Sequence, residues 1–233
     1  MNNSSSPSGT DTKNRHDVYG PVHKGLRKAQ GELLTAIGCA SFDDEAECGA
    51  VLGRLRQILE LASLHLSHED KFVRTAINER SDAGTEVIDA QHKEHRGAFT
   101  QFEDLATEIE RATGPHRISL GRKLYTDLAE YMSEDLEHMN EEETETWPLL
   151  CSLYSDEELM QLEGQIIGSL TPEQSMAFMS IMIPAINKSQ RGALLGGIKA
   201  NAPAEAFNAI MEHAAQPNLS SDDFADLSGR LGL

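Results

Sequence analysis

Apolar positions recur along residues 51–72 at alternating steps of four and three, the spacing of one face of a helix in a bundle. This stripe consists of Val51, Leu55, Ile58, Ala62, His65, Glu69 and Phe72. The rhythm returns twice, as Ile88, His92, His95, Phe99, Phe102, Ala106 and Ile109, and as Leu124, Leu128, Tyr131, Asp135, His138 and Glu142. The pattern predicts three long helices, each with ionisable side chains on an otherwise apolar face.

Turn signals place the ends of these helices and of one more before them. A first helix is predicted from near Pro21, because proline is tolerated in a first turn, to near Gly38. The acidic residues at 43–45 suit the positive N-terminus of the second helix. Further breaks are expected at residues 78–84, at residues 113–115 and at Pro148. The predicted fold class is therefore all-α, with an up-down-up-down four-helix bundle over residues 16–150.

The two ends of the chain differ from the bundle. Residues 1–15 are rich in Ser, Asn and Gly and are predicted to be a disordered N-terminal arm. Residues 151–233 are predicted to be a helical C-terminal extension. Its expected helix starts are Thr171, Asn187, Pro203 and Ser220, with a stop at Pro184. The extension holds no cluster of metal-ligating residues, which favours a role in packing, in binding a protein partner or in self-association.

Composition narrows the class of protein. The net charge of −18 opposes binding to nucleic acid or to an anionic membrane surface. No apolar run reaches the roughly 18–20 residues needed to span a bilayer, and the N-terminal residues lack the apolar core of a signal peptide. The three cysteines, Cys39, Cys48 and Cys151, have no metal-binding or redox spacing. We expect reduced thiols and a cytoplasmic location.

Two motifs suggest metal chemistry. His65 lies four residues before Glu69, and His138 lies four residues before Glu142, so each pair shares one face of its helix. Each motif follows another histidine at a similar distance: His23 is 42 residues before His65, and His95 is 43 before His138. Buried ionisable groups must be paired or bind metal. The set predicts a site for two transition-metal ions, and imidazole with carboxylate but no thiolate suits iron, manganese or zinc.

With these residues in place, the chain resembles the hemerythrin-like (HHE cation-binding) family. The resemblance is carried by His23 in Val-His-Lys-Gly-Leu-Arg, His65 and Glu69 in His-Leu-Ser-His-Glu, His95 in Glu-His-Arg, and His138 and Glu142 in His-Met-Asn-Glu-Glu. It covers about residues 16–150, and the segment after them resembles an extension in a bacterial subgroup. The resemblance implies a non-heme diiron site that binds dioxygen or a related molecule. It places His23 and His65 on one iron, His95 and His138 on the other with His92 as a further candidate, and Glu69 and Glu142 as bridges.

The chain also departs from the oxygen-carrying members of that family. They have two histidines spaced by four on the third helix and a bridging aspartate, whereas His92 and His95 are spaced by three and both bridging candidates are glutamates. This pattern is closer to the branch with four histidines, which includes iron–sulfur-centre repair proteins. His92 is either a ligand or a partner of a carboxylate, and Asp135 is expected to orient an imidazole N–H. Of the acidic run around Glu142, only Glu142 itself has the phase to point inward.

Two functions follow, and whether the protein is an enzyme stays open. The first is a diiron protein that binds dioxygen, nitric oxide or peroxide for sensing, storage or stress response. The alternative is a diiron oxidase, peroxidase or iron-centre repair protein. A ferritin-like carboxylate site ranks below both, because its Glu-x-x-His pairs are only approximated by Asp89 with His92 and Asp135 with His138.

Overall fold

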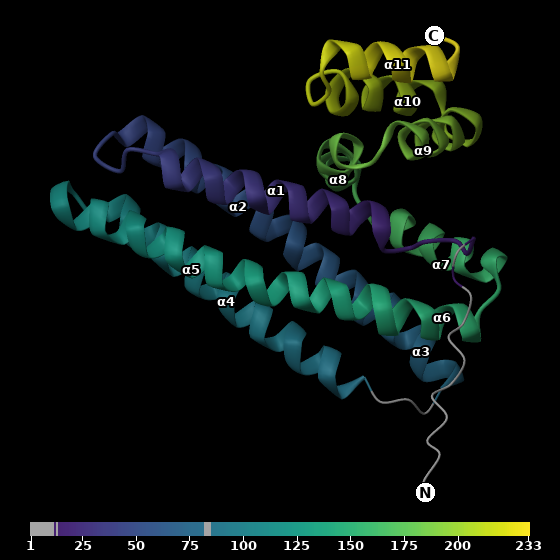
Figure 1. Ribbon diagram of the computed structural model, residues 1–233, viewed down its shortest axis with the longest axis horizontal. Helices are drawn as coiled ribbons and strands as arrows, with labels where there is room; N and C mark the ends of the chain where they lie inside the picture. Colours follow the sequence, from purple (N-terminus) through teal and green to yellow (C-terminus); the bar gives the residue numbers. More distant parts are fainter. Residues whose placement is uncertain (1–11, 13, 82–84) are drawn as a thin grey trace, which may run out of the picture.

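The computed structural model describes residue 12, residues 14–81 and residues 85–233. Within these residues all regular structure is helical and no strand occurs, which confirms the all-α prediction (Figure 1). Most of the predicted disordered arm lies outside the described residues. Its last residue, Arg15, donates hydrogen bonds to Asp156 Oδ1 at 2.7 Å and to the carbonyls of Cys151 and Tyr154.

Four long helices form the predicted up-down-up-down bundle. They are α1 (Gly20–Cys39), α2 (Glu45–His68), α4 (Glu86–Arg111) and α5 (Gly114–Glu141). Each contacts two of the others, in the ring order α1, α2, α4, α5 (Figure 1). Their apolar stripes enclose one core that runs along the bundle from its α1–α2 and α4–α5 connections toward the opposite end.

The start of α2 agrees with the acidic signal in the sequence. Asp44 is the residue before the helix, and its Oδ1 accepts hydrogen bonds from the backbone N–H groups of Ala46 and Glu47 at 2.8 and 3.0 Å. A side chain in this position satisfies donors that have no partner within the helix. Nearby, the ring of Phe42 lies 2.3 Å from where a Cβ of Gly121 would be, so only glycine allows this approach of α5.

At the other end of the bundle, α2 and α5 each pass into a π-helical turn. The first turn is η1 (Glu69–Val73), followed by α3 (Arg74–Arg80), and the second is η2 (Glu142–Thr146), followed by α6 (Trp147–Leu153). A π-turn adds one residue to a helical turn. Consequently Val73 is buried where the stripe predicted Phe72, which is only half-buried.

The expectation that Pro148 closes the fourth helix is wrong. Pro148 lies in the first turn of α6, and helical structure continues to Leu153. The proline follows directly on the π-turn η2, where the regular hydrogen-bond pattern of α5 is already interrupted. The helix therefore also crosses the predicted domain boundary at residue 150.

The C-terminal extension consists of α7 (Asp156–Gly168), α8 (Pro172–Ala185), α9 (Lys188–Asn201), α10 (Ala204–Ile210), η3 (Met211–Ala215) and α11 (Ser221–Leu231). The expected starts at Thr171, Asn187, Pro203 and Ser220 are confirmed as the residues before α8 to α11. Helix α8 packs on α1, and the helices after it share a second apolar core (Figure 1).

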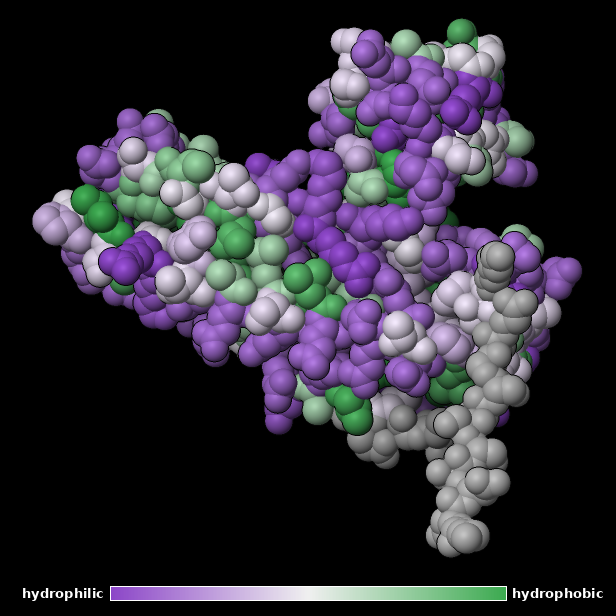
Figure 2. All heavy atoms as spheres, in the orientation of Figure 1, coloured by the Kyte–Doolittle hydropathy of each residue, from purple (hydrophilic) through white to green (hydrophobic). Residues whose placement is uncertain are grey.

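The surface seen in Figure 2 is mostly hydrophilic, with small and scattered hydrophobic areas, as expected for a chain with a net charge of −18. A search of the helices in the described residues finds none with enough length and apolar character to cross a bilayer.

Candidate metal centre

The ionisable residues on the predicted seams are buried inside the bundle. They are His23 on α1, His65 on α2, Glu69 at the start of η1, His92 and His95 on α4, Asp135 and His138 on α5, and Glu142 at the start of η2. They occupy a layer of the bundle between two apolar clusters. The main core lies on one side, and Tyr19, Val73, Ile77 and Leu150 close the other.

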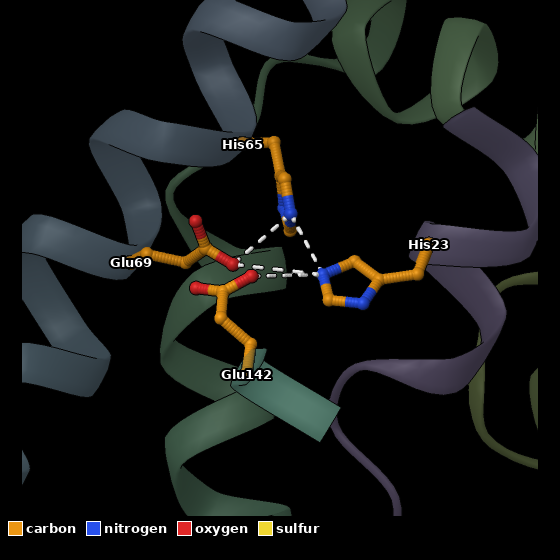
Figure 3. Close-up of side chains that lie close together, drawn as sticks. All are labelled: His23, His65, Glu69 and Glu142. Carbon is orange, nitrogen blue, oxygen red and sulfur yellow. Dashed lines mark hydrogen bonds and ion pairs between the residues drawn. The ribbon is translucent and has the colours of Figure 1, made fainter. Parts of the chain in front are cut away.

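Four of these side chains form a first group around His23 (Figure 3). His23 Nε2 lies 3.1 Å from His65 Nε2 and 3.3 Å from Glu142 Oε2. Glu69 Oε1 is 3.0 Å from His65 Nε2 and 3.8 Å from His23 Nε2. The close-up shows both carboxylates and both imidazoles directed at one another, with His65 and Glu69 on one continuous helical segment and His23 and Glu142 on two others.

A second group lies on the other side of the same two carboxylates. It contains Glu69, His92, His138 and Glu142. His92 Nε2 is 3.6 Å from Glu69 Oε2 and 3.9 Å from Glu142 Oε1, and His138 Nε2 is 3.5 Å from Glu142 Oε2. In each group the ligand atoms all lie within 4.8 Å of one another. Because Glu69 and Glu142 belong to both groups, the arrangement has places for two cations with shared carboxylates.

Hydrogen bonds at the outer nitrogens determine which way three of the imidazoles present their lone pairs. The Nδ1 atoms of His23, His92 and His138 each lie 2.9 Å from an acceptor: Glu143 Oε1, Asp70 Oδ1 and Gln91 Oε1. The amide of Gln91 has this orientation because its Nε2 donates to Glu141 at 2.8 Å. An acceptor at Nδ1 requires the proton there, so a neutral ring turns the lone pair of Nε2 toward the carboxylates.

Several of the converging atoms are acceptors that have no hydrogen-bond donor, as expected where a cation binds. Among the described residues no hydrogen-bond partner is present for Glu69 Oε1 and Oε2, for His92 and His138 Nε2, or for Glu142 Oε2. Leaving so many buried acceptors unpaired is costly, whereas neutral imidazole nitrogens and carboxylate oxygens are ligands for first-row transition metals. The residues present therefore fit a metal centre.

Burial and close contacts between ionisable groups shift the pKa values of several side chains in the centre. Burial, together with the nearby Glu69, raises the pKa of Glu142 to about 8. Burial lowers the pKa of His138 to about 3, which leaves this imidazole neutral at neutral pH. Although burial opposes it, contacts with Glu142, Glu143 and Glu69 raise the pKa of His23 well above its usual value. Binding of metal cations would replace these protons and allow both carboxylates to ionise.

His95 and Asp135 lie beside the two groups rather than in them. His95 Nε2 is 3.7 Å from Asp135 Oδ1, and its ring centroid is 4.9 Å from that of His138. Asp135 accepts hydrogen bonds from Gln30 Nε2 at 2.8 Å and from the Tyr131 hydroxyl at 3.1 Å. Asp135 thus lies near the imidazole of His95 without a hydrogen bond to it, and its role in orienting an imidazole N–H stays a prediction.

Sequence reasoning did not single out Asp70, Glu143 or Gln91, which hold the outer nitrogens of three imidazoles. Glu143 was expected to be solvated, yet its Oε1 lies 2.9 Å from Nδ1 of His23. A signal for two of the three was present: each His-x-x-x-Glu motif is followed at once by a second acidic residue, Asp70 or Glu143.

Comparison with known proteins agrees with this geometry. Neither the curated proteins nor the solved structures include a significant match to this chain. The model of the hemerythrin HHE cation binding domain, however, matches residues 19–150, which is more than half of the chain and includes every residue of both groups. The bundle, the buried His and Glu clusters and this match together show that the chain belongs to the hemerythrin HHE cation-binding family.

Proposed function

We propose that this protein holds two non-heme iron ions and binds dioxygen or a related small molecule, nitric oxide or peroxide, for sensing, storage or stress response. The observation that carries the proposal is the sharing of Glu69 and Glu142 between two groups of ligand atoms. One ion would be held by His23 and His65, the other by His92 and His138, with both carboxylates bridging. Manganese or zinc could occupy the same ligands.

The protein's own residues prepare this centre in three ways. Glu143, Asp70 and Gln91 fix the orientation of three imidazoles. The two apolar clusters keep water away and make every electrostatic interaction in the centre stronger. When bound, the metal ions supply the open coordination positions at which a small molecule can bind. His95 remains a ligand candidate from the sequence, but the geometry favours His92.

The proposal is tested on protein purified under reducing, anaerobic conditions. We expect two iron ions per chain by elemental analysis and, on exposure to O₂, a charge-transfer absorption band that disappears on deoxygenation. His65→Ala should retain about half of the iron or less, because it removes an imidazole of one group. Iron-free protein, or iron that is retained fully without His65, would refute the assignment of the site.

A second candidate function, a diiron oxidase, peroxidase or repair enzyme, is favoured by one observation. The hydroxyl of Tyr19 is buried without a hydrogen-bond partner in the described residues, and its ring centroid lies 5.0 Å from that of His23. Burial and the two glutamates raise the pKa of Tyr19 well above its usual value, so the phenol keeps its proton. A phenol in this position could donate a hydrogen bond or an electron to a molecule in the centre. Loss of peroxide turnover in Tyr19→Phe, with iron retained, would support the enzyme.

A further inference from the structure

Both π-turns begin at a glutamate of the centre and continue with a second acidic residue. In η1 Glu69 is followed by Asp70, and in η2 Glu142 is followed by Glu143. The first acid of each turn points into the two ligand groups. The second acid points to the outer nitrogen of a histidine instead, so one turn supplies two carboxylates with different tasks.

The second acid of each turn contacts a histidine of the other hairpin. Asp70 follows α2, and its Oδ1 lies 2.9 Å from Nδ1 of His92 on α4. Glu143 follows α5, and its Oε1 lies 2.9 Å from Nδ1 of His23 on α1. The α1–α2 hairpin thus orients an imidazole of the α4–α5 hairpin, and the reverse holds as well.

An arginine supports each of these acids. Arg96 follows His92 by four residues and pairs with Asp70 Oδ2, while Arg27 follows His23 by four residues and lies 2.6 Å from Glu143 Oε1. Each crossed clamp therefore consists of a histidine and an arginine from one hairpin around an acid from the other.

We propose that Asp70 and Glu143 are positioning residues, each controlling one metal ion through the imidazole of the opposite hairpin. The inference rests on the proposed metal function. A carboxylate at Nδ1 fixes the tautomer and ring orientation of a histidine and makes its Nε2 a stronger ligand. Neither hairpin alone has a complete site. The first histidine of each hairpin, His23 on α1 or His92 on α4, is oriented only when the other hairpin packs against it. The two ions are thereby linked through the packing of the hairpins.

The first test measures metal affinity. Apoprotein is titrated with Fe(II) without oxygen, in competition with a chelator, for wild type, Asp70→Ala, Asp70→Asn and Glu143→Ala. Each alanine variant should lower the affinity for one of the two ions about 10- to 100-fold, the usual effect of losing a residue that orients a metal ligand. Asp70→Asn keeps an acceptor of nearly the same shape and should lose less. Glu103→Ala serves as control, since Glu103 on α4 pairs across the hairpins with Arg56 on α2 at 3.2 Å on the exposed surface.

The second test separates positioning from a general structural role. In Zn(II)-loaded protein, long-range ¹H–¹⁵N spectra report which ring nitrogen of each histidine carries the proton. Asp70→Ala should alter the Nδ1–H signal of His92 and leave that of His23 unchanged, and Glu143→Ala should do the opposite. Equal changes at both histidines, or none, would overturn the inference. If wild-type protein binds metal and the variants match it in affinity, the inference alone fails; if wild type binds no metal, the proposed function fails with it.

Discussion

The two hairpins of the bundle carry the same chemistry on helices of different length. In the first, 42 residues separate His23 from His65; in the second, 46 separate His92 from His138. Measured from the histidines to the hairpin connection, the second hairpin is longer by three residues on α4 and by four on α5, about one turn each. Its connection is shorter, residues 112–113 against residues 40–44. Because both helices lengthen together, the histidine and the His-x-x-x-Glu motif stay opposite each other.

This difference shows what the repeat preserves. The spacing of 43 residues from His95 to His138 matches the first hairpin better than 46 does, yet it is His92 that joins the ligand group. The preserved features are the level along the bundle and the crossed clamp: His23 with Arg27 and His92 with Arg96 read His-Lys-x-x-Arg in both hairpins.

The largest effect is expected from the two shared carboxylates. One comes from each hairpin, so the comparison predicts that Glu69→Ala and Glu142→Ala behave alike. Each should retain less than half of the wild-type iron, with the loss spread over both ions, because each carboxylate belongs to both ligand groups. Iron is measured per chain after anaerobic purification. Glu130→Ala, which removes an exposed carboxylate of α5, should bind iron as wild type does. If either variant kept one ion at full occupancy, the prediction that both carboxylates contact both ions would be wrong.

A smaller effect separates the two histidines of α4. His92→Ala should lose about one of the two ions, because His92 Nε2 faces both shared carboxylates. His95→Ala should keep both, because His95 Nε2 is nearest to Asp135. The measurement is again iron per chain, with the ¹H–¹⁵N spectrum of the zinc form to follow His138. Loss of iron in His95→Ala but not in His92→Ala would contradict the structure and support the ligand assigned from the 43-residue spacing between His95 and His138.

Metal removal should affect both hairpins together. Ions present at 100 times their dissociation constant stabilise the folded state by about 2.7 kcal/mol, which a chelator would remove. Urea unfolding with and without chelator measures this difference. Hydrogen exchange should then rise in both hairpins around the centre, while α9–α11, which share a separate apolar core with α8, should keep their protection. An increase confined to one hairpin would contradict the crossed clamps.

The sequence predicted the parts of this molecule that depend on periodicity. The apolar stripes located three of the four long helices, and turn signals located the first. The stripes also placed His65, Glu69, Asp135, His138 and Glu142 in the interior, where the structure has them. Local capping chemistry located α8 to α11. Both signals act within a few residues, so a single sequence is enough to read them.

The features that sequence reasoning did not predict lie at the π-turns and in the pairing of the two hairpins. A π-turn leaves no mark in the periodicity before it, so the shift from Phe72 to Val73 could not be foreseen. The contact of Glu143 with His23 was missed because the apolar stripe assigns an inward position to Glu142 alone. Pairing across hairpins also depends on which helix packs against which, and this is decided by the whole core rather than by any one motif.

The smallest expected effect lies at the far end of the hairpins, where they differ in how their second helix begins. Asp44 accepts two backbone hydrogen bonds at the start of α2, whereas Thr113 makes no such bond before α5. Asp44→Ala should therefore lower the free energy of unfolding by about 1 kcal/mol, and Thr113→Ala by less. Urea unfolding measures both. Iron per chain should stay at the wild-type value in each variant, because the apolar core separates these caps from the centre. Equal destabilisation of the two variants would show that the two caps contribute the same free energy despite their different hydrogen bonding. Loss of iron would show that the hairpin connections influence the alignment of the histidines in the centre.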